Sequence, residues 1–252
     1  MFRLRVLALA SCVLAVGVLC VRAQDNDALK AILRKSMEAH GGEKNLTKYK
    51  AAVTKFKGTI EIMGNKSDMT GETSLQKPDK VKNTMSLNIN NMNIDIVTVF
   101  NGKQLWVSVL GKTMEITDEK ILNAAREEMQ AEGAGSFSDF LKPPYELNAI
   151  GEVKVKGKDA IGIRISKKGQ KDISMFFDKE TNLVVKTEMR TLDAQSGQEV
   201  LQEKFIIGYQ DKAGMKVAKR VEIHKDGKTF MDIEILETQP FERLDDSHFA
   251  KP

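Results

Sequence analysis

Cysteine is scarce in this chain of 252 residues, and its two cysteines, Cys12 and Cys20, both lie close to the N-terminus. The rest of the sequence therefore has no thiol that could form a disulfide, ligate a metal or attack a substrate. Histidine is also scarce, because only His40, His224 and His248 are present and none has the His-x-x-x-His spacing of a zinc site. We therefore expect no metal centre, no cofactor and no cysteine catalysis.

The motifs of common catalytic sites are missing as well. No Gly-x-Ser-x-Gly segment, which would mark the nucleophile of an esterase, accompanies the His40-Gly41-Gly42 segment. The glycine-rich residues 133–136 lack the third glycine of a dinucleotide site and the Gly-Lys-Ser/Thr of a phosphate loop. Neither Glu127-Glu128 nor Asp245-Asp246 presents an obvious acid/base pair. The sequence therefore favours a protein that is not an enzyme.

An excess of positive charge is also absent once the first 23 residues are set aside. Arg3, Arg5 and Arg22 lie there without any acidic residue, and removing these three from the 39 basic residues leaves 36 against 35 acidic ones. A nearly neutral chain gives no electrostatic basis for binding nucleic acid. Lysine-rich segments at residues 154–158 and 167–171 could touch anionic lipid headgroups, although such lysines usually keep strand edges soluble. We expect no nucleic-acid partner and at most a transient contact with a membrane surface.

One long hydrophobic run occurs, from Val6 to Val21, and it follows a short basic start. The small-residue pattern Val21-Arg22-Ala23 after it is typical of a signal-peptidase site. We predict that residues 1–23 form a signal peptide and that residues 24–252 are periplasmic or secreted after cleavage. An uncleaved membrane anchor and a lipid-modified cysteine are the alternatives, although the run is shorter than the ~20 residues that span a bilayer.

Hydrophobic periodicity predicts one helix followed by many strands. Residues 28–39 carry apolar side chains at helical spacing, and His40-Gly41-Gly42 ends the pattern. Beyond Ala52, apolar and polar residues alternate, as they do in half-buried antiparallel strands. Turn signals such as Asn90-Asn91 and Asn101-Gly102 separate these segments, and we expect Asn101-Gly102 to form a type I′ hairpin turn.

The segment from Thr117 to Gln130 interrupts this alternation with a helical pattern, and Phe137, Phe140 and Leu141 follow it. We predict that these segments form an inserted helical cover. Ten or more strands with one apolar face each cannot stay flat, and no Pro/Gly/Ser-rich linker divides the chain. The predicted fold is therefore mainly β, with residues 24–252 forming a single antiparallel incomplete β-barrel, or half-barrel, of about ten or more strands with an N-terminal helix.

Several segments resemble exported bacterial proteins of the LolA/LolB-like superfamily. They are the leader, the Ala39-His40-Gly41-Gly42 turn after the first helix, the antiparallel hairpins, the Phe177–Val184 turn and the closing Leu244–Pro252 segment. The resemblance implies an incomplete β-barrel whose concave face is covered by helices. It also implies a soluble carrier of lipid or of the acyl chains of lipoproteins, although no arginine here matches the one in the carrier's cavity.

We therefore expect a noncatalytic periplasmic monomer that holds a hydrophobic ligand, such as a lipid or a lipoprotein acyl chain. Methionines on the strand faces suit an adaptable apolar surface. The residues expected to line the ligand cavity are Trp106, Met114, Met129, Phe137, Phe140 and Leu141. The alternative is a structural or protein-interaction module of the cell envelope with a filled core.

Trp106 is the only tryptophan, and its strand position places it on the opposite face from Leu105 and Val107. An indole at this position is an exposed aromatic, a contact of the helical cover, or a sign that the strand is covered on both faces. We expect contact with the helical cover.

Overall fold

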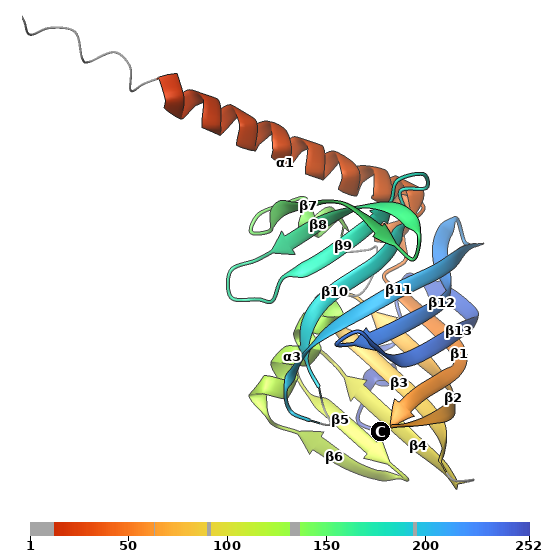
Figure 1. The fold of residues 1–252 in the computed structure, drawn as a ribbon. Helices are drawn as coiled ribbons and strands as arrows, with labels where there is room; N and C mark the ends of the chain where they lie inside the picture. Colours follow the sequence, from red (N-terminus) through yellow and green to blue (C-terminus); the bar gives the residue numbers. More distant parts are fainter. Residues whose placement is uncertain (1–12, 63, 90–91, 132–136, 194–195) are drawn as a thin grey trace, which may run out of the picture.

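The computed structural model describes residues 13–62, 64–89, 92–131, 137–193 and 196–252. Across these residues thirteen strands form one curved antiparallel sheet (Figure 1). The strands are β1 (Ala51–Ile62), β2 (Asn65–Gln76), β3 (Lys80–Ile89), β4 (Met92–Phe100), β5 (Leu105–Val109), β6 (Lys112–Ile116), β7 (Glu146–Val155), β8 (Lys158–Ser166), β9 (Ile173–Asp178), β10 (Val184–Leu192), β11 (Glu199–Lys212), β12 (Met215–Lys225) and β13 (Lys228–Phe241). The prediction of a mainly β chain with ten or more antiparallel strands is confirmed.

The strand order places the first and last strands side by side in the sheet. It runs β6-β5-β4-β3-β2-β1-β13-β12-β11-β10-β9-β8-β7, so β1 pairs with β13, and β6 and β7 are the free edges. The connection between these edges carries α3 (Glu119–Ala131) and α4 (Phe137–Phe140). Figure 1 shows α3 on the side where the sheet stays open, between β5 and β10. The sheet is therefore a half-barrel, as the sequence predicts.

Two-residue hairpin turns join several of the strands. Leu110-Gly111, Lys156-Gly157, Ala213-Gly214 and Asp226-Gly227 have positive φ at both positions, as a type I′ turn requires. The predicted hairpin at Asn101-Gly102 forms, but its turn differs from the prediction. The Asn101 side chain accepts hydrogen bonds from the backbone N–H groups two and three residues later, and only Gly102 of that pair has positive φ. An Asx-type turn therefore replaces the type I′ turn.

Helix α1 (Val13–Ala39) ends where the sequence predicts, and α2 (Gly42–Lys48) follows it. Gly41 makes this junction possible, because its φ is 120° and an added Cβ would lie 2.4 Å from the carbonyl oxygen of Gly214. Helix α1 runs without a break through the predicted cleavage position after Ala23. Among the residues that the structure describes, no helix has both the length and the apolar character needed to cross a membrane.

Two hydrophobic clusters lie between the helices and one face of the sheet, which we call the inner face. The cluster under α1 and α4 contains Leu29, Leu33, Met37, Phe137, Phe140, Ile163, Ile165, Ile173, Met175, Phe177 and Val184. The cluster under α3 contains Phe100, Leu105, Leu122 and Met129. Burial of each large apolar side chain contributes roughly 1.5–3 kcal/mol to stability, so these clusters fix the helices on the sheet.

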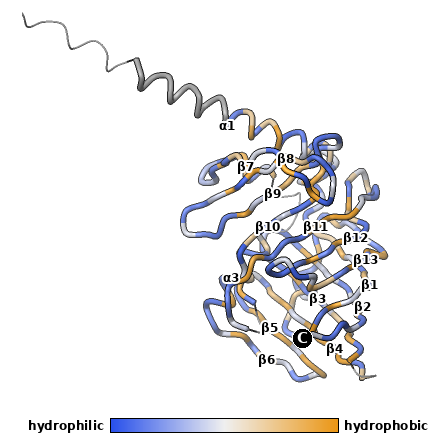
Figure 2. The backbone as a smooth tube through the Cα atoms, in the orientation of Figure 1, coloured by the Kyte–Doolittle hydropathy of each residue, from blue (hydrophilic) through white to orange (hydrophobic). Residues whose placement is uncertain are grey.

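The opposite, outer face is covered differently in its two halves. A short 3₁₀ helix, η2 (Asp246–Phe249), lies against β3 and packs Phe249 beside Val99 and Trp106. On the other half, the ammonium of Lys186 lies 2.5 Å from the carboxylates of Glu188 and of Glu203. In Figure 2, hydrophobic and hydrophilic residues alternate along the strands.

Candidate functional site

The residues predicted to cover a ligand instead pack into the core. Phe137 is 0% exposed and Phe140 is 2% exposed, and both contact α1 and the sheet, with Leu141 packed against the same cluster. Their burial is explained by α1, because its apolar stripe at Leu29 and Leu33 needs a partner on the inner face. These three residues therefore fill the β8–β10 half of the half-barrel.

Two of the remaining three residues predicted to line the cavity, Met129 and Met114, lie apart from them. Met129 is buried under α3, in the cluster with Phe100 and Leu122. Met114 lies on the free edge strand β6, opposite Val107, and is 58% exposed. The structure therefore does not gather the predicted residues around one cavity.

Trp106 corrects the expectation that it contacts the helical cover. It is 5% exposed and packs against Val99 and Phe249 on the outer face, where the C-terminal segment covers it. Leu105, its neighbour in β5, faces α3 on the inner side. This strand is therefore covered on both faces, which was one of the alternatives for an indole of this parity.

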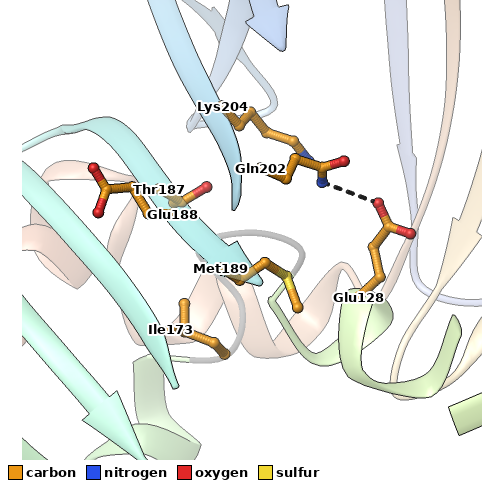
Figure 3. A pocket seen from close by; sticks show the side chains of 7 residues that line it. All are labelled: Glu128, Ile173, Thr187, Glu188, Met189, Gln202 and Lys204. Atoms are coloured by element: carbon orange, nitrogen blue, oxygen red, sulfur yellow. Dashed lines mark hydrogen bonds between the residues drawn. The ribbon is translucent and has the colours of Figure 1, made fainter. Parts of the chain in front are cut away.

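A small pocket lies beside α3, with a cavity volume of about 10 Å³, and Figure 3 shows the side chains that line it. Ile173 and Met189 give it an apolar side, whereas Gln202 and Lys204 give it a polar side. The side-chain amide of Gln202 donates a 3.2 Å hydrogen bond to Glu128 of α3. This volume is far below the ~300–1,000 Å³ of small-molecule sites and has room for about one water molecule. The hydrogen bond ties the helix to β11.

A third hydrophobic cluster lies on the inner face, and we call it the open face. Its buried members are Phe56, Ile60, Met69 and Leu87. Half-buried side chains packed against them are Ile62, Met85, Ile89, Ile94, Ile96, Phe230, Met231, Ile233 and Ile235. All of these residues come from strands β1, β2, β3, β4 and β13, and no helical residue belongs to the cluster within the described part of the chain.

Strand register explains why these side chains lie together. Phe56 pairs with Gly71 on one side and with Ile235 on the other, and Met85 and Ile96 continue the same row across the sheet. The ring of Phe56 lies over Gly71, where an added Cβ would come within 2.6 Å of it. The alternation in the sequence predicts these strands, but it does not distinguish an open row from one covered by a helix.

Lysines of the two lysine-rich segments contact acidic or aromatic side chains. Lys154 lies 2.8 Å from Asp159, Lys156 contacts Glu222, and the ammonium of Lys167 lies 5.3 Å from the ring centroid of Tyr145. Such pairing agrees with the interpretation of these lysines as surface charges that keep strand edges soluble. These contacts provide no separate argument for a membrane-binding patch.

His40 lies between α1, α4 and β11. It is 2% exposed, its Nδ1 donates a 2.8 Å hydrogen bond to the carbonyl oxygen of Ser36, and the rings of Phe137 and Tyr209 flank it. Burial lowers the pKa of His40 from 6.5 to about 4, so the ring is neutral near pH 7. Within the described residues, no group of three His, Cys, Asp or Glu side chains is placed to hold a metal ion.

No protein-family model and no curated protein matches this sequence. Solved structures match it in fold. A domain from Vibrio parahaemolyticus that is assigned to outer-membrane lipoprotein sorting is 11% identical, has a TM-score of 0.54, and the match covers 89% of this chain and 97% of that one. A LolA superfamily protein from Nitrosomonas europaea is 10% identical, with a TM-score of 0.52 and coverage of 88% and 97%.

This chain has a LolA-like fold. A DUF1329 family protein from Desulfovibrio piger shares the fold, with 12% identity, a TM-score of 0.57 and coverage of 88% of this chain and 97% of that one. The sequence resemblance to the LolA/LolB-like superfamily is thus confirmed for the architecture. At these identities the similarity shows the LolA-like fold alone, and function has to be argued from the site itself.

Proposed function

We propose that this LolA-like protein binds a hydrophobic ligand, such as a lipid or a lipoprotein acyl chain, on its open face and carries it without catalysing a reaction. The observation that carries the proposal is the set of half-buried apolar side chains on the inner face that no described helix covers. Contiguous apolar surfaces of this kind mark ligand or partner sites in soluble proteins. The assignment of one protein of similar fold to outer-membrane lipoprotein sorting supports the same interpretation.

The energetics of such binding set the expected affinity. Each methylene moved out of water contributes ~0.8 kcal/mol, so a fully buried twelve-carbon chain gains about 9 kcal/mol. Association and ordering oppose this gain by ~4–15 kcal/mol. Even a fully buried chain would thus retain at most about 5 kcal/mol, which corresponds to a dissociation constant of about 0.2 mM. Because the open face covers a ligand from one side only, we expect affinity near the millimolar range for a single acyl chain.

The proposed location follows from the predicted signal peptide. Removal of residues 1–23 would release a periplasmic or secreted monomer that begins within α1. The remaining helix still carries Leu29, Leu33 and Met37, the residues that bind it to the sheet. A carrier of this kind would contact a membrane surface only while it collects or delivers its ligand.

A second candidate is a structural or protein-interaction module of the cell envelope with a filled core. It is favoured by the two helix-covered clusters, in which Phe137 and Phe100 are both 0% exposed, and by the modest pocket beside α3. In that case the open face would bind another protein or remain solvated. The two candidates differ in whether a free hydrophobic molecule binds the open face.

Fluorescence of N-phenyl-1-naphthylamine, an uncharged apolar probe, tests the proposal on the purified protein. We expect saturable enhancement, with affinity several-fold weaker in Ile235→Gln, because Ile235 lies in the open face. Leu236→Gln is the matched control, since Leu236 lies at the adjacent strand irregularity and is 53% exposed. Absence of saturable enhancement, or equal weakening by both variants, would contradict binding at the open face and favour the filled-core module.

A further inference from the structure

A row of uncharged polar side chains crosses the inner face beside the open face. We call it the polar row, and it consists of Thr238, Thr54, Thr73, Asn83 and Thr98. Each residue is the direct cross-strand partner of the next, so the row spans the five adjacent strands β13, β1, β2, β3 and β4. Side chains in such positions lie ~4.5–5.5 Å apart at Cβ.

Apolar side chains flank the polar row on both sides. Towards α3 the next row contains Leu75, Val81 and Phe100, which belong to the cluster under that helix. Towards the hairpin ends the next row contains Phe56 and Met85 of the open face. The polar row is therefore a narrow band of hydrogen-bonding groups within an apolar surface.

One member of the polar row lacks a hydrogen-bond partner. The hydroxyls of Thr54 and Thr238 lie 3.4 Å apart and satisfy each other. The side-chain oxygen of Asn83 is buried and has no hydrogen-bond partner among the described residues. A buried acceptor without a donor costs about 1–3 kcal/mol, so a ligand that supplies an N–H or O–H here recovers that free energy.

Charge is absent from this part of the inner face. The polar row and the two rows beyond it place fifteen residues on five strands: Thr238, Ile235, Ile233, Thr54, Phe56, Gly58, Thr73, Gly71, Met69, Asn83, Met85, Leu87, Thr98, Ile96 and Ile94. None of these side chains is charged, so a ligand carboxylate at the polar row would lose hydration without gaining a counter-ion. An uncharged polar group loses far less hydration free energy and can form hydrogen bonds there.

The dimensions of the open face suit one acyl chain. Six residue steps separate Phe56, next to the polar row, from Ile62 at the hairpin end of β1. At ~3.3 Å per residue this distance is about 20 Å. One leaflet of a bilayer holds acyl chains within ~15 Å, so a chain anchored at the polar row ends before the hairpin rim.

We infer that the polar row recognises an uncharged hydroxyl or amide group attached to an acyl chain, so that the ligand is a neutral acylglycerol or N-acyl amide rather than a fatty-acid anion. The inference rests on the proposed function, because the chain itself would lie on the open face. Asn83 accepts the hydroxyl or amide hydrogen of the ligand, and the threonine hydroxyls donate to its carbonyl oxygen. The geometry thus places specificity in the polar row and affinity in the apolar rows.

Displacement of bound N-phenyl-1-naphthylamine by four ligands with the same twelve-carbon acyl chain tests this inference. Monolauroylglycerol and N-lauroylglycinamide carry donors and acceptors, methyl laurate carries only acceptors, and laurate is an anion near pH 7. We expect the first two to displace the probe at about tenfold lower concentration than the last two, since tenfold corresponds to 1.4 kcal/mol. Equal displacement by monolauroylglycerol and N-lauroylglycinamide supports recognition of the chemistry that they share. A preference for monolauroylglycerol identifies the source as a lipid, and a preference for N-lauroylglycinamide identifies it as an acylated protein.

Variants on strand β3 assign the discrimination to its residue. Asn83→Leu keeps the side-chain size and should reduce the tenfold difference to threefold or less, while the affinity for the probe stays within twofold. Asn88→Leu is the control, because Asn88 lies on the same strand, faces outward and is exposed. Thr98→Val provides a second inner-face variant that keeps side-chain shape if Asn83→Leu folds poorly.

The outcomes separate the inference from the proposed function. Saturable probe binding with equal displacement by laurate and monolauroylglycerol would overturn the inference and leave the proposed function intact. Discrimination that survives both Asn83→Leu and Thr98→Val would overturn it as well. A failure of the probe to bind would remove the proposed function, and the inference with it.

Discussion

The Nε2 atom of His40 lies 3.4 Å from the hydroxyl oxygen of Tyr209, at the point where α1, α4 and β11 meet. The Tyr209 hydroxyl donates a 2.6 Å hydrogen bond to the carbonyl oxygen of Val184, so it holds both β10 and the end of α1. Burial raises the pKa of Tyr209, which keeps this hydroxyl protonated over the ordinary pH range. Burial, rather than these contacts, keeps the imidazole of His40 neutral, because it lowers the pKa of the ring to about 4.

Protonation of His40 should therefore destabilise the protein. The pKa is about 4 in the folded protein and 6.5 as the ordinary value, so between these pH values the unfolded chain binds a proton that the folded chain does not. The free energy of unfolding should fall by up to ~3 kcal/mol from pH 6.5 to pH 4 and stay level above pH 6.5, as far as this group is concerned. Urea unfolding at several pH values measures the slope. His40→Gln should reduce this slope, and an unchanged slope in the variant would contradict the assignment.

The pairing of Asp193 with Lys225 should make the stability of the protein depend on pH in a separate, more acidic range. The Lys225 ammonium lies 2.6 Å from one carboxylate oxygen of Asp193, and the backbone N–H of Ser196 donates to the other. These contacts lower the pKa of Asp193 to about 2, so its stabilisation is present above pH ~4 and is lost as the pH falls towards 2.

Asp193→Asn should reduce the free energy of unfolding at pH 7 by about 1–3 kcal/mol, since Lys225 would lose its partner. Thermal unfolding followed by circular dichroism measures the change. Asp68→Asn on the exposed side of β2 is the control and should unfold within a degree or two of the wild type. Equal effects of the two substitutions would show that the Asp193 contacts contribute little.

The contact between Trp106 and Phe249 predicts the behaviour of the tryptophan fluorescence. Phe249 is 1% exposed and covers the indole on the outer face. Phe249→Ala should cost about 3–5 kcal/mol and shift the Trp106 emission to longer wavelength. Ligands on the open face should leave the emission nearly unchanged, because the indole lies on the opposite side of the sheet. Saturable quenching by monolauroylglycerol in the wild type would contradict this placement.

Export should remove residues 1–23. N-terminal sequencing of the protein recovered after secretion should begin at Gln24, immediately after the Val21-Arg22-Ala23 pattern. Material that begins at Met1, or that carries an acylated cysteine, would contradict the predicted signal peptide and support one of the anchored alternatives. The shortened chain should retain the native circular dichroism, because Leu29, Leu33 and Met37 remain to hold α1.

Local patterns in the sequence predict the architecture well. Alternation of apolar and polar residues predicts the strands and the face on which Trp106 lies, and helical spacing predicts the segment near Thr117–Gln130, since these patterns depend on neighbours in the sequence. The cover of Trp106 depends on Phe249, which lies far along the chain, and no local pattern encodes that contact. Phe137 and Phe140 illustrate the same limit, because a mobile cover and a packed core require the same apolar residues.

The candidate site is predictable only in its chemistry. The sequence shows apolar strands with several methionines, but the polar row becomes visible only when register aligns Thr54, Thr73 and Asn83 across three strands. A shift of one residue in any pair would turn a whole strand's side chains to the other face. Register is set by turns and long-range pairing, which is why the site emerges from the structure.

The pairing of β1 with β13 also has a consequence for how the chain acquires its structure. The middle of the sheet joins the first strand to be synthesised to the last one, so this seam forms only when the C-terminal strand is available. Such distant pairing gives the protein a high contact order and slow closure. Until β13 arrives, β1 and β12 present unpaired edges, and the nascent chain depends on protection from aggregation until synthesis is complete.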